Sequence, residues 1–405
     1  MEKLRNREHD FSSKLRQEST IRRLKEYILW QRNLRKGRTD QSIPSFSPIS
    51  VNLDLTSACN FACPYCVDSK VINRGQVLET ETIEKTMDVL RSHGLLSVIL
   101  IGGGEPTLHK DFGKIVRDAK KRKLQVGIVT NGSRMDRIEE VVEELEEKDW
   151  VRISIDAARE ETFRDLHRPK THEGLTRILE GAKRVKEKNL RVSTGYSFVI
   201  IWEGVEANGN RLRPNLEEIS EAAELAKRYS FDYLSLKPCL VRPEDTQRES
   251  LLDKVDPIEE RAIIEKIKQH LQRARDIADG KVKILESVNL QAMLSGKTQT
   301  IKEQPLTCHM QFFRTVVTPL GIFQCPAFRG VDAARIGDSS GYATEEKFRR
   351  SLEATAELIA GFNASVECKA TGCFYHDTNW WLEGFINSGK DVEEIEKIED
   401  ENFFL

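Results

Sequence analysis

Short apolar runs alternate with charged, amphipathic stretches through the middle of the chain. The runs have the length of strands buried on both faces, and the stretches between them repeat apolar residues at helical spacing. The pattern predicts strands at 51–55, 97–101, 125–130, 151–155, 192–200 and 233–236, with helices at 81–94, 111–123, 137–148, 174–188 and 215–230.

This alternation predicts an α/β fold with a parallel sheet covered by helices. Functional side chains are then expected on the loops that follow the carboxyl ends of the strands. Six units are too few to close an eight-stranded barrel, so we predict a partial (β/α)6, TIM-like barrel over residues 49–240.

The chain before the barrel predicts a basic helical extension over 1–48. Ile21, Leu24 and Ile28 lie near helical spacing, with Ser19 or Thr20 as N-cap, and a Pro- and Ser-rich connection follows at 39–48. We expect this helix to pack on the barrel with its basic face in solvent. Contact with a partner or an anionic substrate is the alternative.

Beyond residue 240 the strand and helix alternation ends. A polar connection at 241–257 and a long charged helix at 258–280 predict a helical linker over 241–299. Strand-like and helical pieces then predict a small α+β domain over 300–385, followed by an acidic tail over 386–405.

Composition narrows the class of protein. The 405 residues are 39% hydrophobic and 32% charged, with a net charge of −2, which suits a large core plus a smaller domain. No apolar run approaches the ~18 residues of a membrane span, and no signal sequence is apparent. We therefore expect a cytoplasmic protein that binds neither membrane nor, given its near-neutral charge, nucleic acid.

Three of the eight cysteines form a C-x3-C-x2-C array directly after the first predicted strand: Cys59, Cys63 and Cys66. Three thiolates hold three corners of a cubane cluster and leave its fourth iron open to another ligand. A structural zinc site is the alternative, but it needs a fourth ligand. His109 is the nearest candidate, and it lies in a different segment.

The array, within "SACNFACPYC", resembles the cluster motif of the radical S-adenosylmethionine (SAM) superfamily. That resemblance implies a [4Fe-4S] cluster whose free iron binds the amino and carboxylate groups of SAM. It also implies that Tyr65 lies against the adenine.

The second strand runs into "IGGGEPTL", a Gly-rich turn that lets backbone approach a ligand closely. Such turns also use Gly for local reasons. Coming after the cysteine array, Gly103, Gly104, Glu105 and Pro106 resemble the GGEP motif of the same superfamily. The resemblance implies that this backbone and Glu105 hold the SAM amino group.

Polar residues follow the next two strands as well. Asn131 follows the third strand, and Ser154 and Asp156 end the fourth. The resemblance implies that Ser154 and Asp156 approach the ribose of SAM, and that Arg168, in "FRDLHRPK", binds its carboxylate. Taken singly, these residues also fit an ordinary turn, a helix cap and a surface arginine.

Four more cysteines come after residue 300, where a hairpin-like element and a helical stretch supply two each: Cys308, Cys325, Cys368 and Cys373. Four thiolates suffice to close one metal centre. The arrangement resembles the twitch domain, a shortened relative of the SPASM domain, which implies one auxiliary [4Fe-4S] cluster. A zinc ribbon is the alternative.

The family's reaction cleaves SAM reductively to a 5′-deoxyadenosyl radical, which takes a hydrogen atom from substrate. We expect a radical SAM oxidoreductase that acts on a small polar metabolite. The auxiliary cluster would accept the substrate's electron, and a flavodoxin or ferredoxin would reduce the enzyme.

Cys239 remains without a cluster, at the end of the sixth strand. It would be the hydrogen-atom donor if the enzyme were an epimerase, whereas a buried core thiol or a replacement cluster ligand are the plainer interpretations. A peptide-modifying maturase and an inactive iron–sulfur scaffold are further alternatives.

Overall fold

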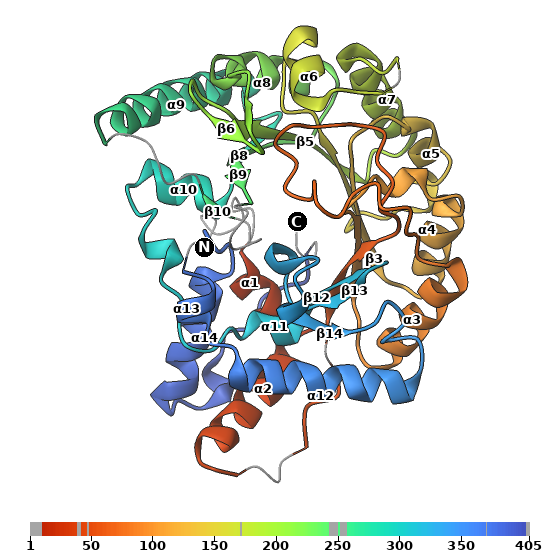
Figure 1. Ribbon diagram of the computed structural model, residues 1–405, viewed down its shortest axis with the longest axis vertical. Coiled ribbons are helices and arrows are strands. Elements are labelled where there is room, and N and C mark those ends of the chain that lie inside the picture. Colours follow the sequence, from red (N-terminus) through yellow and green to blue (C-terminus); the bar gives the residue numbers. More distant parts are fainter. Residues whose placement is uncertain are drawn as a thin grey trace.

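The fold is built on a mostly parallel sheet with helices along its outer side, as the sequence predicts. The structure, a computed structural model (Figure 1), describes residues 10–38, 42–46, 48–170, 172–242, 250–251, 257–369 and 371–401. Within these residues a ten-stranded sheet has the order β11-β8-β5-β4-β3-β2-β1-β12-β13-β14.

The six predicted strands are all present, and their ends lie within two residues of the predicted ones. They pair in parallel in chain order, which places their carboxyl ends along one edge. Their bounds are β1 Ser50–Asp54, β2 Ser97–Ile101, β3 Gln125–Thr130, β4 Trp150–Ser154, β5 Ser193–Ile200 and β8 Tyr233–Pro238.

Two further parallel strands extend this sheet beyond the six units. β11 (Lys283–Glu286) pairs with β8, and β12 (Arg314–Thr318) pairs with β1. The antiparallel strands β13 (Gly321–Phe323) and β14 (Arg335–Gly337) follow β12. The sheet therefore continues from the predicted barrel into the region of the second cysteine group.

Helices form an arc along the outer side of the strands (Figure 1). Each buries an apolar face; in α4, for example, Phe112, Ile115 and Val116 are fully buried. The bounds are α3 Thr80–Ser92, α4 Phe112–Lys121, α5 Met135–Glu139, α6 Glu160–His167, α7 Leu175–Lys188 and α8 Ile219–Arg228.

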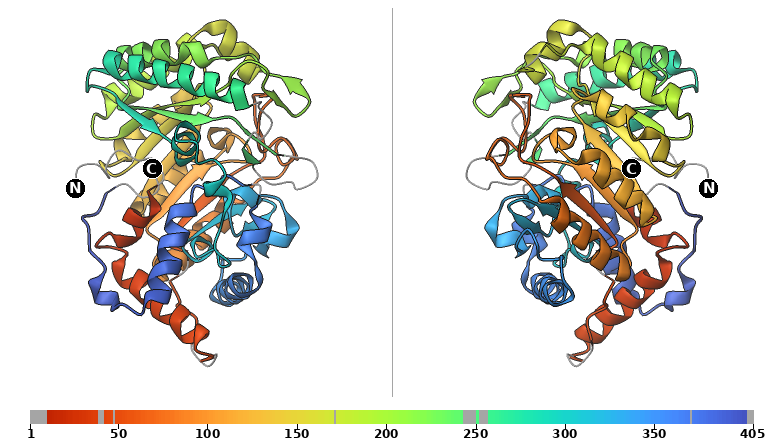
Figure 2. Two further views of the ribbon diagram at one scale, coloured as in Figure 1. Left: turned by 90° about the vertical axis from the view of Figure 1, so that its left-hand side faces the viewer. Right: turned by 90° about the vertical axis from the view of Figure 1, so that its right-hand side faces the viewer.

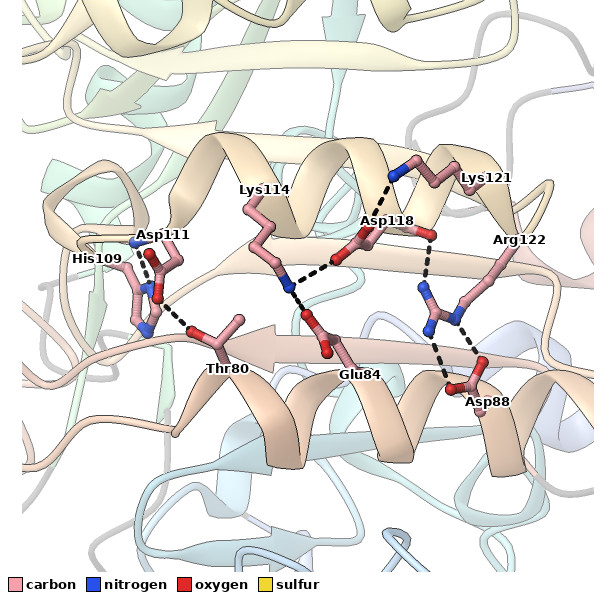
Figure 3. Close-up of polar contacts among 9 residues, drawn as sticks. All are labelled: Thr80, Glu84, Asp88, His109, Asp111, Lys114, Asp118, Lys121 and Arg122. Atoms are coloured by element: carbon pink, nitrogen blue, oxygen red, sulfur yellow. Dashed lines mark hydrogen bonds and ion pairs between the residues drawn. The ribbon is translucent and has the colours of Figure 1, made fainter.

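The polar faces of α3 and α4 are joined by ion pairs (Figure 3). Asp88 accepts from two guanidinium nitrogens of Arg122, at 2.7 and 2.9 Å. Lys114 pairs with Glu84 and with Asp118. Because Asp88 and Lys114 are more than half exposed, these pairs contribute little, at most about 1 kcal/mol each.

Residues 241–299 hold more than the predicted linker. α9 (Pro257–Ala278) packs on α8, with Ile267, Leu271 and Ala274 buried, and β11 continues the sheet. The amphipathic pattern of α9 explains this packing. The predicted polar connection falls largely on 243–249 and 252–256, which lie outside the described residues.

The N-terminal helices pack against the C-terminal end of the chain. α1 (Phe11–Arg16) and α2 (Ile21–Arg35) contact α14 (His376–Ser388), and Figure 2 shows these segments side by side. A backbone bridge joins Gln17 to Ile398. The basic extension packs mainly on α14 and the acidic tail, which the sequence did not predict, and Arg23 of α2 also lies against Gly94, just after α3 of the barrel.

The remaining helices lie around the second cysteine group: α10 Val288–Leu294, α11 Met310–Phe313, α12 Glu345–Gly361 and α13 Ala364–Glu367. Two short hairpins complete the fold, β6 Glu206–Ala207 with β7 Asn210–Arg211, and β9 Leu240–Val241 with β10 Ser250–Leu251. In the described part of the chain, every helix is too short or too polar to cross a bilayer.

Candidate functional site

The loop after β1 carries the first three cysteines, and neighbouring loops hold it in place. The backbone N–H of Cys59 donates to Asn73 Oδ1 at 2.9 Å, and Asn208 Nδ2 donates to the carbonyls of Pro64 and Cys66 at 2.9 and 3.3 Å. All three thiols are free and partly exposed. The structure thus presents them on one short, well-supported loop.

Burial disfavours the thiolate form of these cysteines, although Lys170 acts on Cys59 and Arg329 on Cys66 in the opposite direction. Burial raises the pKa of Cys63 well above its ordinary value and that of Cys66 to about 12, so the free site favours thiols over thiolates. A bound metal reverses this preference, because a coordinated thiol is deprotonated. Three free thiols, with the Asn131 Nδ2 amide 4.0 Å from Cys59, fit a thiolate-bound cluster.

No preformed zinc site accompanies them. Among the described residues, no three Cys, His, Asp or Glu side chains stand as a ready set of metal ligands, so the thiols must turn together on binding. His109 accepts from the Asp111 backbone N–H at 3.2 Å (Figure 3), and its other ring nitrogen lies 2.9 Å from the Leu78 carbonyl. With both nitrogens engaged, His109 does not serve as a fourth ligand.

The turn after β2 packs directly against the cysteine loop. A Cβ on Gly104 would come within 2.4 Å of the Thr56 carbonyl oxygen and 2.5 Å of that of Ala58. The backbone N–H of Glu105 donates to the Ala58 carbonyl at 2.8 Å. Only glycine allows this approach, which makes the predicted GGEP turn and the cysteine loop one unit.

The Glu105 carboxylate ties this unit to the end of β3. One oxygen accepts from Thr107 (backbone 3.1 Å, hydroxyl 2.5 Å) and the Thr130 hydroxyl (2.7 Å), and the other accepts from the Asn131 backbone N–H at 2.7 Å. Burial raises the Glu105 pKa, and these hydrogen bonds oppose the rise. Oε2, with one described partner, retains capacity for a ligand amine. Pro106 begins the short helical turn that follows.

Tyr65, in the cysteine loop, is hydrogen-bonded to Asp156, which follows β4. The Tyr65 hydroxyl donates to Asp156 Oδ2 at 2.5 Å, and the other oxygen accepts from the Val199 N–H at 2.7 Å. Asp156 has a left-handed backbone, with φ of +51°. Ser154 ends β4 two residues earlier, so the structure gathers the predicted strand-end residues on one side.

Arg168 lies apart from this group. It caps α6 with φ of +44°, and its guanidinium contacts Asn210 Oδ1 at 3.4 and 3.5 Å. It lines a surface cleft of about 380 Å³ with Pro64 and Arg211. Among the described contacts, none joins its side chain to the GGEP turn.

The four C-terminal cysteines all line one small cavity. Cys308, Cys368 and Cys373 are buried, and Cys325 is half-buried. Burial raises the Cys373 pKa first, followed by the proximity of the other three thiols. Asn379 Nδ2 donates to the Cys308 sulfur at 3.5 Å. Four cysteines around one cavity are the donor set that the predicted four-thiolate centre needs, and, as at the first site, their thiols would have to turn together on binding because no three described side chains stand as a ready set of metal ligands.

Cys239 lies between these two sites. The residue is fully buried. A thiolate at Cys239 would raise the pKa of Tyr65, so the two side chains lie near one another. Leu240, the next residue, lines the cavity of the second cysteine group. Burial, and then Asp156, raise the Cys239 pKa to about 12, so the thiol stays protonated at neutral pH.

A buried ion-pair network connects the two cysteine regions. Arg329, four residues after Cys325, contacts Asp54 Oδ2 at 2.6 Å and both oxygens of Asp68 at 3.0 and 2.9 Å. Asp54 ends β1 and accepts from the Gly103 N–H at 3.1 Å. Arg242 donates to the Arg329 carbonyl at 2.9 Å. Sequence analysis missed this network; the one available signal was a charged residue at the end of a buried strand.

Comparison with known proteins agrees with the motif. Residues 53–205 match the family model of the radical SAM superfamily. The S-adenosylmethionine-dependent nucleotide dehydratase of Selenomonas ruminantium is 36% identical over 114 residues, 28% of this chain and 41% of that protein. Mycofactocin maturase MftC of Mycolicibacterium smegmatis is 30% identical over 185 residues, 45% and 43%. The matches thus span less than half of these relatives.

Solved structures agree in fold. SuiB of Streptococcus suis superposes with a TM-score of 0.57 at 16% identity, covering 91% of this chain and 80% of its own. The anSMEcpe structure gives 0.54 at 17% identity, covering 85% of this chain and all of its own. Residues 53–205 thus match the radical SAM superfamily, whose members use a [4Fe-4S] cluster and SAM, and the solved structures agree with this chain in fold.

Proposed function

We propose that this radical SAM enzyme oxidises a small polar metabolite, with a second iron–sulfur cluster as the electron acceptor. The observation that carries the proposal is the single cavity lined by all four C-terminal cysteines. Its link to the first cysteine loop through buried Arg329 supports electron transfer between the two regions.

Each cofactor has a proposed set of residues. Cys59, Cys63 and Cys66 hold the first cluster, and the C-terminal cysteines hold the second. Tyr65, the GGEP turn and the strand-end residues Asn131, Ser154 and Asp156 bind SAM. When bound, these groups supply one-electron chemistry: SAM cleavage, hydrogen abstraction from substrate, and an acceptor for the remaining electron.

The chain's own residues bind and orient. Gly103 and Gly104 bring backbone close to the ligand, and Glu105 keeps the turn fixed to β3 while offering Oε2 to the SAM amine. Arg168 requires a rotation of its side chain to reach the SAM carboxylate, because its guanidinium lies at Asn210. Holding the reacting groups in one geometry is the protein's main contribution.

The proposed substrate class rests on how the N-terminal helices pack. α1 and α2 are occupied by α14 and the tail of their own chain, which leaves them unsuited to present a leader peptide. SuiB has been solved with its precursor peptide SuiA, so a peptide substrate is the competing proposal. A flavodoxin or ferredoxin is the proposed electron donor.

Epimerisation is a second candidate, favoured by the position of Cys239. A protonated thiol beside Tyr65 and Asp156 suits hydrogen-atom donation to a substrate radical from the face opposite SAM. In that reaction the thiol's hydrogen forms the new C–H bond, and the thiyl radical left behind takes an electron and a proton from the reducing system.

The test is product analysis after anaerobic turnover with candidate metabolites. Oxidation predicts a product two hydrogens lighter than the substrate, with one 5′-deoxyadenosine formed per product. A product of unchanged mass in H2O that gains one deuterium in D2O would reject oxidation in favour of epimerisation, and the Cys239→Ala variant should then fail to incorporate that deuterium. SAM cleavage that no metabolite stimulates, but a peptide does, would reject the proposed substrate class.

A further inference from the structure

The cavity of the second cysteine group is bordered by buried polar atoms that have no hydrogen-bond partner. Gln324 is 1% exposed, and neither its Nε2 nor its Oε1 is paired. Tyr375 is 2% exposed with an unpaired hydroxyl, and the Thr371 hydroxyl is also unpaired. Each such group destabilises the fold when it is left unpaired. With the unpaired Oε1 of Gln311, four residues of one cavity carry such atoms, which indicates a bound group that completes them.

Among the described residues, no charged side chain lines this cavity. Besides the four cysteines and apolar residues, the described lining has the neutral polar side chains of Gln311, Gln324, Thr371 and Tyr375. A cluster held by four thiolates becomes more negative when it is reduced, and a low-dielectric surrounding opposes that charge. Neutral donors are therefore the stabilising groups that this lining offers.

One described cation outside the lining acts on a residue of the cavity wall. Arg314 is a buried cation that acts on Tyr375, but its guanidinium bonds to Asn52 Oδ1 at 2.6 Å. It faces a strand of the sheet and is absent from the cavity wall. The potential of a group in this cavity thus depends chiefly on dipoles.

Two amide side chains, those of Asn379 and Gln311, already contact the Cys308 sulfur. Asn379 Nδ2 donates to Cys308 Sγ at 3.5 Å while Asn379 Oδ1 accepts from the Met310 N–H at 3.1 Å. Gln324 directly precedes Cys325, and Tyr375 comes two residues after Cys373, so both lie beside ligands of the same centre. Unlike Asn379, they have donors left over.

We propose that Gln324 and Tyr375 donate hydrogen bonds to sulfur atoms of the iron–sulfur cluster held by Cys308, Cys325, Cys368 and Cys373, and so raise its reduction potential. Hydrogen bonds to sulfur favour the more negative, reduced form. This inference rests on the proposed second cluster and deepens it, because a raised potential suits an electron acceptor.

The test compares three variants of the full-length, reconstituted protein: Tyr375→Phe, Gln324→Leu and a control, Tyr342→Phe. Tyr342 is equally buried in the same part of the chain but lies outside the cavity lining. Iron and sulfide are counted first, and the second cluster is then titrated potentiometrically with EPR detection. The Cys59→Ala/Cys63→Ala/Cys66→Ala variant identifies its signal.

The expected result is a more negative midpoint potential in Tyr375→Phe and in Gln324→Leu, a larger shift in the double variant, and no shift in Tyr342→Phe. Tyr375→Phe should also lose one exchangeable-proton coupling in ENDOR spectra recorded after transfer to D2O. If either Tyr375→Phe or Gln324→Leu fails to bind the second cluster, the potential measured for the other still tests the proposal.

Two results would overturn the inference, and they differ in what else they reject. A fully loaded second cluster with unchanged potential in both variants rejects the donor assignment and leaves the second cluster standing. A wild-type protein with only the first cluster, or with zinc at the C-terminal cysteines, rejects the second cluster and the donor role together.

Discussion

At the scale of single residues, Arg329 is the side chain on which the two cysteine regions converge. It is 4% exposed and contacts two buried carboxylates, Asp54 from the end of β1 and Asp68 from just after Cys66. Buried charges are tolerated only when paired. Arg329 therefore fixes the segment after Cys325 against the first cysteine loop.

Replacing Arg329 with Met tests this role. The change leaves two buried carboxylates without their shared cation, and we expect the metal-free protein to lose about 3–5 kcal/mol of unfolding free energy in urea. Arg335→Met is the control: Arg335 lies six residues on in an exposed pair with Asp332 and should cost less than about 1 kcal/mol. Equal losses of unfolding free energy in the two variants would show that the buried ion pairs of Arg329 do not stabilise the protein more than an exposed pair does.

Asp54 gives the protein a pH-dependent stability. Burial raises its pKa from 3.8 to about 6, although Arg329 opposes the rise. Between these two values the folded chain keeps a proton that the unfolded chain has released. The contribution of Asp54 to stability is therefore present below pH 4 and is lost as pH rises through about 6.

Comparing wild type with Asp54→Asn isolates this effect. From pH 4 to pH 7 the wild type should lose up to about 3 kcal/mol more unfolding free energy than the variant, at about 1.4 kcal/mol per pKa unit. Urea titrations of the metal-free proteins at several pH values measure it. Parallel pH profiles for the two proteins would contradict the raised pKa.

At the scale of elements, the site is made of turns at the carboxyl ends of neighbouring strands. The turn after β2 lies on the loop after β1, and Glu105 fastens it to the end of β3. The outer helices support these turns from a distance: the ion pairs between α3 and α4 (Figure 3) lie on an exposed face. Function should therefore depend on turn geometry more than on helix surfaces.

Gly104→Ala tests the contact between the two turns. Its Cβ would meet two backbone carbonyl oxygens closer than 3 Å, so the GGEP turn must move. SAM cleavage should fall on the order of a hundredfold, as for a misplacement of about 1 Å, while iron bound by the C-terminal cysteines stays unchanged.

The matched control is Gly384→Ala in α14, where an added Cβ meets nothing within 4 Å. This change should leave SAM cleavage intact and stabilise the helix by about 0.5–1 kcal/mol. If Gly104→Ala cleaved SAM at the wild-type rate, the turn would not be the part of the site that we assign.

At the scale of the whole molecule, the two ends of the chain close on one another. Lys14 pairs with Glu401, Lys25 with Glu393, and Arg16 with Glu396. The basic N-terminal segment thus finds its partner in the acidic tail, and its charge needs no external ligand to explain it.

Charge exchange tests this closure. Lys25→Glu should cost at most about 1 kcal/mol, and adding Glu393→Lys should restore most of it. The difference should shrink in concentrated salt, which screens exposed pairs. Thermal unfolding at two salt concentrations measures both effects, and a double variant no better than the single one would argue against the pair.

How much of this the sequence could predict depends on the range of each interaction. The six strands and the two cysteine groups are local patterns in the sequence. The ends of the strands were predicted within two residues. The ion pair of Arg329 with Asp54 joins positions 275 apart, and no local pattern marks it. β11, with four residues, is too short to reveal that it extends the sheet.

Arg168 is a residue that the sequence motif marks but whose side-chain contacts the motif does not predict. Its position after α6 matches the family pattern, yet its left-handed backbone directs the guanidinium to Asn210. A motif position fixes where a residue lies along the chain, whereas the backbone angles and neighbours decide where its side chain points.

We propose that this chain holds two iron–sulfur clusters and cleaves SAM. The most direct measurement is anaerobic reconstitution of the full chain with iron and sulfide, followed by iron counting and assay of 5′-deoxyadenosine after reduction with SAM. We predict about eight irons per chain in the wild type, about four in Cys308→Ala, and SAM cleavage in the wild type. About four irons in the wild type, or zinc retained at the C-terminal cysteines, would mean that the chain holds no second iron–sulfur cluster.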